Sequence, residues 1–90
     1  MKYTQTTLNK LEKLIEETGY IVRFERGNFQ SGFCILEERK VVVLNNFLQL
    51  EGKINTMIDI IPQLQVDAES LTPESRKVYL DVVTQSAEKN

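Results

Sequence analysis

Histidine is absent from the 90-residue chain, tryptophan is absent too, and cysteine occurs once. Without histidine there is no imidazole to act as a general base, to complete a catalytic triad or to bind zinc. One cysteine can form neither an internal disulfide nor a cysteine-rich zinc site. The lone thiol, Cys34, lies between Phe33 and Ile35 in an apolar stretch. We therefore expect it to be buried and inert, and we expect no cofactor.

The chain also lacks long hydrophobic runs and an excess of charge of one sign. Eleven basic and thirteen acidic side chains give a net charge of −2, unlike the basic balance of dedicated DNA-binding domains. The apolar runs are far shorter than the roughly 20 residues that cross a bilayer. The polar start MKYTQTTLNK has no signal-peptide core. These features predict a cytoplasmic protein that does not contact membranes.

Length and composition predict one globular domain over residues 1–90, with 41% hydrophobic and 27% charged residues. A first amphipathic helix is expected from Thr7 to Thr18, because leucines and an isoleucine recur there at helical spacing. Gly19 follows, where a helix commonly ends in the left-handed region. The period then changes to two, since Tyr20, Val22 and Phe24 alternate with Ile21, Arg23 and Glu25, as in a half-buried strand.

Three strands are expected, over Tyr20–Glu25, Phe29–Glu37 and Lys40–Leu44. Short connections at 26–28 and 38–39 favour an antiparallel meander of these strands in chain order. The third strand is apolar at consecutive positions, which point to opposite faces of a sheet. Either helices cover both faces, or another chain pairs with this strand. We therefore regard Val41, Val42 and Val43 as a candidate dimer edge.

The second half of the chain predicts two more helices. The second carries the strongest helical period in the sequence and should be largely buried, ending at Pro62; its apolar positions are Phe47, Leu50, Ile54, Met57, Ile58 and Ile61. Residues 63–71 are expected to be a connector, and 72–88 a C-terminal helix with a thin apolar stripe. That helix should be peripheral and pack on its own domain or on a partner. The fold class is thus α+β: an N-terminal helix, a three-stranded antiparallel meander, a buried second helix and a peripheral C-terminal helix.

The predicted first hairpin mixes arginines, aromatic residues and amides. Arginine can contact phosphate while aromatic rings stack on bases, so this segment could bind single-stranded nucleic acid or another anion. The candidate surface for a ligand or partner comprises Arg23, Arg26, Asn28, Phe29 and Lys40. A carboxylate-dependent enzyme is the remaining alternative, although the spacing of the acidic residues does not require a shared site.

The run RFERGNFQSGFCILEERKVVVLNNF, followed by LEGKINTMIDII, resembles a family of short, uncharacterised bacterial proteins over about residues 8–61. The resemblance implies a bacterial cytoplasmic origin and no particular activity. A strand hairpin followed by a helix is also similar to the core of gluzincin peptidases, whose helix carries HExxH. The corresponding residues here, 56–61, contain no histidine, so that likeness implies no zinc site.

Together these observations predict a non-enzymatic protein-interaction module that acts as a homodimer. Its partner is expected to be a second copy of itself, with another protein as an alternative. Nucleic-acid or anion binding through residues 23–33 is the second hypothesis, and a carboxylate-dependent enzyme is the third.

Overall fold

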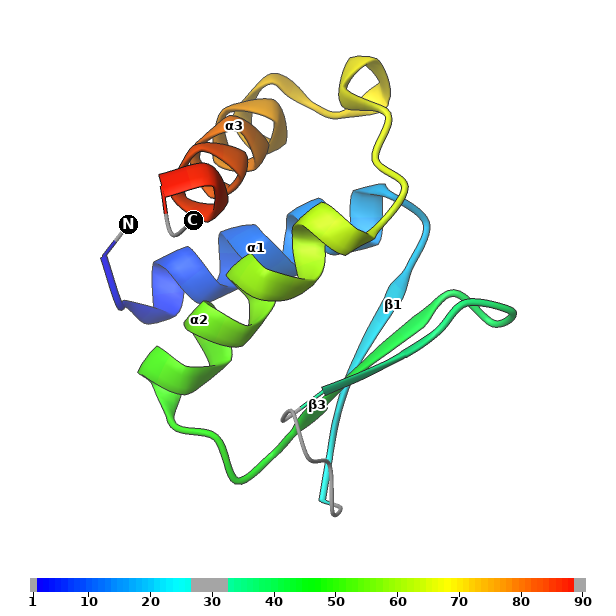
Figure 1. Ribbon diagram of the computed structural model, residues 1–90, viewed down its shortest axis with the longest axis vertical. Coiled ribbons are helices and arrows are strands. Elements are labelled where there is room, and N and C mark those ends of the chain that lie inside the picture. The colour runs from blue at the N-terminus through cyan, green and yellow to red at the C-terminus, as the bar shows by residue number, and fades with distance from the viewer. Residues whose placement is uncertain (1, 27–32, 89–90) are drawn as a thin grey trace.

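The computed structural model describes residues 2–26 and 33–88 and has the predicted α+β character. Three helices lie on one side of a three-stranded sheet (Figure 1). In chain order the elements are α1 (Gln5–Glu17), β1 (Ile21–Glu25), β2 (Phe33–Leu36), β3 (Val41–Asn45), α2 (Leu50–Ile60), two 3-10 turns (Ile61–Gln63 and Ala68–Ser70) and α3 (Pro73–Glu88).

The sheet is mixed, so the predicted antiparallel meander is wrong. The strand order is β1-β3-β2, with β1 parallel and β2 antiparallel to β3. Val41–Val43 therefore lie in the central strand, which is paired on both sides, and form no free edge; the edge strands are β1 and β2. The physical reason is burial, because the strand that is apolar on both faces gains most from neighbours on both sides. Its first four residues are all buried.

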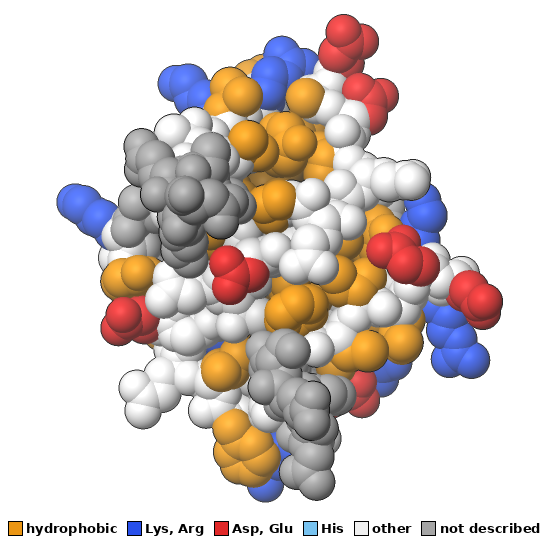
Figure 2. Space-filling view, in the orientation of Figure 1, with side chains coloured by type: hydrophobic (Ala, Val, Ile, Leu, Met, Phe, Trp, Pro, Cys, Tyr) orange, Lys and Arg blue, Asp and Glu red, His pale blue; other side chains and the backbone are white. Residues whose placement is uncertain are grey.

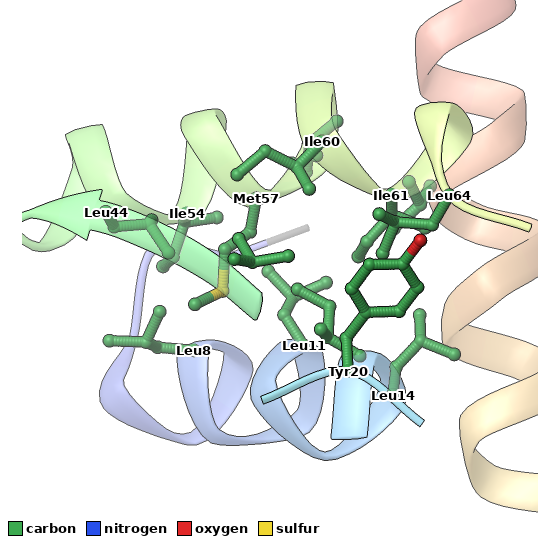
Figure 3. Close-up of a cluster of buried hydrophobic side chains, with 14 of the residues drawn as sticks. Leu8, Leu11, Leu14, Tyr20, Leu44, Ile54, Met57, Ile60, Ile61 and Leu64 are labelled. Atoms are coloured by element: carbon green, nitrogen blue, oxygen red, sulfur yellow. The ribbon is translucent and has the colours of Figure 1, made fainter. Parts of the chain in front are cut away.

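The core lies between the sheet and the first two helices. Leu8 and Leu11 of α1 face Ile54 and Met57 of α2, and Leu14 lies toward the other end of the cluster, as Figure 3 shows. The central strand contributes two side chains to this cluster, Val42 and Leu44. Tyr20, with 3% of its surface exposed, lies at one end of the cluster beside Leu14 and Leu64 (Figure 3). As predicted, Gly19 before it adopts a positive φ, of 95°.

The start of the second helix differs from the expectation. α2 begins at Leu50, and Phe47, predicted to lie on its buried stripe, is 70% exposed. Asn45 explains the shift, since its side-chain Oδ1 accepts from the Phe47 backbone N–H at 3.0 Å and its carbonyl accepts from the Leu48 N–H at 3.1 Å. The Asn45 side chain and carbonyl thus offer the backbone a local turn as an alternative to a helix at this point.

The C-terminal helix packs on its own chain, which decides between the two placements left open by the sequence. α3 lies against α1, and its Val82 is completely buried. The connector before α3 also contributes to the core through Leu64 and Leu71, which are 7% and 4% exposed. At the N-terminus of α3, the Glu17 carboxylate at the end of α1 accepts hydrogen bonds from Thr72 and Ser75. The helix is thus tied to the domain at its first turn and along its length.

Candidate interaction surface

The two faces of the sheet have different surroundings. Val42 and Leu44 of β3 point into the core, and their register partners on β1 and β2, namely Val22, Phe24, Phe33 and Ile35, pack against it. Successive side chains of a strand point to opposite faces. The remaining positions therefore form an outer face, and Figure 1 shows α1, α2 and α3 on the other side of the sheet.

An apolar row crosses this outer face. The register aligns Ile21 of β1, Val41 of β3 and Leu36 of β2. Ile21 is 58% exposed and Leu36 is 42% exposed, whereas Val41 between them is 9% exposed. The two outer members of the row shield the central valine but remain open to solvent themselves. The row is consequently an apolar surface that a partner could cover.

The next row of the outer face is more polar. Arg23, Val43 and Cys34 are aligned by the same register. Cys34 is half-buried, so the expectation of a fully buried thiol is wrong. The Arg23 Nη2 lies 3.6 Å from the Glu25 Oε1, and both side chains are substantially exposed. This ion pair follows the solvent side of β1 and contributes little to stability.

The three predicted ligand-binding residues that the structure describes, Arg23, Arg26 and Lys40, do not form one cluster. Arg26 lies at one end of β1, where its guanidinium is 5.3 Å from the centre of the exposed Phe47 ring. Lys40 lies at the opposite end of the sheet, beside the start of β1, with its Nζ 5.8 Å from the centre of the Tyr20 ring. Asn28 and Phe29 fall outside the described residues. Arg23, Arg26 and Lys40 therefore face acidic or aromatic neighbours at separate places on the sheet.

A hollow lies beside the turn that joins β2 to β3. Its volume is about 380 Å³, and the described residues that line it are Ile35, Leu36, Glu37, Glu38 and Arg39. The Tyr20 hydroxyl donates to the Glu37 Oε2 at 2.6 Å, which fixes the turn to the core. This hydrogen bond, with burial and the carboxylate charge, raises the pKa of Tyr20 above its usual 10.0. Glu37 thus has a structural role in holding the turn.

Figure 2 shows hydrophobic side chains at several places on one face of the molecule, with most charged side chains toward its rim. Among the residues that the structure describes, no three acidic or cysteine side chains come close enough together to hold a metal ion. Over the same part of the chain, no helix has the length and apolar character needed to cross a membrane.

Comparisons of the chain with protein-family models, curated proteins and solved structures found no match. The resemblance to short bacterial proteins therefore stays a prediction.

The sequence did not single out Ile21 or Leu36 as surface residues. The alternation along β1 places the Ile21 side chain on the other face of the strand from Val22 and Phe24. That pattern was a usable signal for its outward position. For Leu36 the signal was weaker, because the whole of β2 is apolar in sequence.

Proposed function

We propose that the protein is a non-enzymatic interaction module that acts as a homodimer, and that its sheet carries the contact. The observation that supports this most is the outer row of Ile21, Val41 and Leu36, which spans all three strands and remains partly exposed. Apolar surface at the end of a small open sheet favours association, because burying it removes it from water.

The edge strands add to this support. A three-stranded sheet with open edges presents unpaired backbone donors and acceptors, which natural proteins usually protect with lysine, proline or a bulge. β1 contains no proline and pairs with β3 at each of its five residues without a bulge. Its edge is therefore regular enough to accept another strand.

Size-exclusion chromatography with light scattering tests the proposal directly. The expected result is a mass of twice the 10.4 kDa monomer at tens of micromolar, with dissociation on dilution. Ile21→Ser should weaken the dimer, whereas Leu80→Ser, a matched change of an exposed residue on α3, should not. A monomer throughout this range would contradict the proposal. If that monomer bound single-stranded RNA at low salt, the evidence would favour the nucleic-acid hypothesis instead.

A further inference from the structure

The free edge of β1 has a defined set of hydrogen-bonding groups. The Ile21 N–H donates to the Lys40 carbonyl at 2.8 Å, and the Glu25 carbonyl accepts from the Asn46 N–H at 2.9 Å. Backbone groups of alternate residues point to opposite sides of a strand. The backbone N–H and C=O groups of Ile21, Arg23 and Glu25 therefore point toward β3. Those of Val22 and Phe24 point toward the free edge.

The side chains of β1 add a pattern of charge. Arg23 and Glu25 lie two residues apart on the outer face, with Phe24 between them on the inner face. In an antiparallel pair of two identical strands, a two-fold axis at Phe24 places Arg23 of each copy opposite Glu25 of the other. Opposite charges at such positions stabilise a sheet, whereas like charges destabilise it.

The same axis satisfies the backbone. With the two-fold axis at Phe24, the two Phe24 residues exchange N–H and C=O hydrogen bonds, because both groups point to the free edge. Arg23 and Glu25 of the second copy then form a non-hydrogen-bonded pair, in which opposed side chains lie closest. Hydrogen bonding and charge thus select the same register.

We propose that two copies of the chain join β1 to β1 in antiparallel orientation about a two-fold axis at Phe24, extending each three-stranded sheet into one continuous sheet. This inference rests on the proposed homodimer and specifies its contact. Such a contact is isologous, since the same residues serve in both copies, as in most homodimers.

The other arrangements of these strands are less favourable. An axis at Arg23 would set the two Arg23 side chains directly opposite each other. An axis at Val22 would place Arg23 opposite Ile21 and leave Glu25 without an opposite charge in the second copy. The β2 edge, Phe33–Leu36, has four residues and no charged side chain, so it provides no charge complementarity with a second copy of itself.

Charge reversal tests the register. Arg23→Glu and Glu25→Arg should each weaken dimerisation by about tenfold or more, because two like-charge pairs replace two attractive ones. The double variant, Arg23→Glu with Glu25→Arg, should restore the affinity, since it re-forms both pairs with reversed sign. Lys77→Glu, at an exposed position on α3, makes the same charge change as Arg23→Glu away from the sheet and should leave the affinity unchanged. Circular dichroism would confirm that each variant is folded.

Cysteine cross-linking gives an independent reading of the same register. In a Cys34→Ala background, Arg23→Cys protein mixed with Glu25→Cys protein should form a mixed disulfide. Opposed Cα atoms in a non-hydrogen-bonded pair are about 4.5 Å apart, which a disulfide can span. Either protein alone should cross-link poorly, because its two cysteines would lie diagonally, roughly 7–8 Å apart.

The outcomes separate this inference from the proposed function. A dimer whose affinity is the same in the wild type and both single charge variants would overturn the β1 contact and leave the homodimer standing. Efficient cross-linking of Arg23→Cys protein alone would place the axis at Arg23 and overturn the register. A wild-type protein that stays monomeric would overturn both.

Discussion

Ser75, at the start of α3, donates a hydrogen bond of 2.6 Å to the carboxylate of Glu17, which lies 58 residues earlier at the end of α1. The same carboxylate accepts from the Thr72 backbone N–H at 2.8 Å and from the Thr72 hydroxyl at 3.1 Å. Glu17 therefore caps a helix to which it does not belong. A carboxylate at this position also interacts favourably with the positive end of the helix dipole.

Replacing Glu17 with alanine should destabilise the fold by about 1–2 kcal/mol. The change removes the acceptor of three hydrogen bonds and leaves the hydroxyl of Ser75, which is 1% exposed, without this partner. Urea denaturation followed by circular dichroism measures the effect. The matched control is Glu16→Ala, since the neighbouring side chain is exposed and its loss should change stability little. Equal effects of the two variants would show that the cap does not stabilise the fold.

The same carboxylate should make stability depend on pH in the acid range. Burial alone would raise the pKa of Glu17, but hydrogen bonds from Ser75 and Thr72 outweigh burial and lower this pKa below the usual 4.5. A carboxyl group whose pKa is lower in the folded state stabilises the fold above its unfolded pKa. That contribution is lost as the pH falls through the folded pKa. The loss should begin below roughly pH 5.5.

Glu12 acts in the opposite direction, because burial and the nearby Glu16 charge raise its pKa. The pH dependence of the free energy of unfolding is therefore compared between the wild type and Glu17→Gln, since Glu12 contributes equally to both. The free energy of unfolding of Glu17→Gln should fall less than that of the wild type between pH 6 and pH 3 (about the range over which a carboxyl group titrates). Parallel pH profiles of the two proteins would contradict the assignment to Glu17.

Loss of the Tyr20–Glu37 hydrogen bond should loosen the turn between β2 and β3. Tyr20→Phe keeps the ring in the core but removes the hydroxyl that donates to Glu37, at an expected cost of about 1 kcal/mol. Because the pKa of Tyr20 is higher in the folded protein than in the unfolded chain, the protonated hydroxyl stabilises the fold below about pH 10. This contribution is lost as the pH rises through the pKa of Tyr20 in the folded protein. Glu37→Ala should match the effect of Tyr20→Phe at neutral pH, whereas Glu38→Ala should have little effect. A double variant with additive losses would show that the two groups are not coupled.

Local periodicity was sufficient to predict the types of element in this chain but not their arrangement in space. The helical spacing of Leu8, Leu11 and Leu14 predicted α1, and all three leucines are buried. Short connections suggested a meander because neighbours in sequence commonly pair. The consecutive burial of Val41–Leu44 is typical of a central strand, and that tertiary requirement prevailed over chain order.

The remaining contacts depend on separations that sequence spacing does not encode. Glu17 and Ser75 meet only after α3 has packed on α1, and nothing in either local sequence indicates the other. Phe47 fits the helical period of α2, but it lies within the turn made by Asn45, before the helix begins, and its ring is exposed. For the interaction surface, the sequence pointed to the strands but placed the free edge on β3 in place of β1.

Amide hydrogen exchange should report the strand order and the dimer contact together. In the order β1-β3-β2, the central strand is hydrogen-bonded on both sides, so all amides of Val42–Leu44 should exchange slowly. In β1, Arg23 should be protected by β3, while Val22 and Phe24 should exchange fast at concentrations where the protein is monomeric. Both should become protected as the concentration rises and the β1 edges pair, because paired amides exchange only after opening. Slow exchange at Val22 and Phe24 that does not vary with concentration would mean that this edge is covered within one chain.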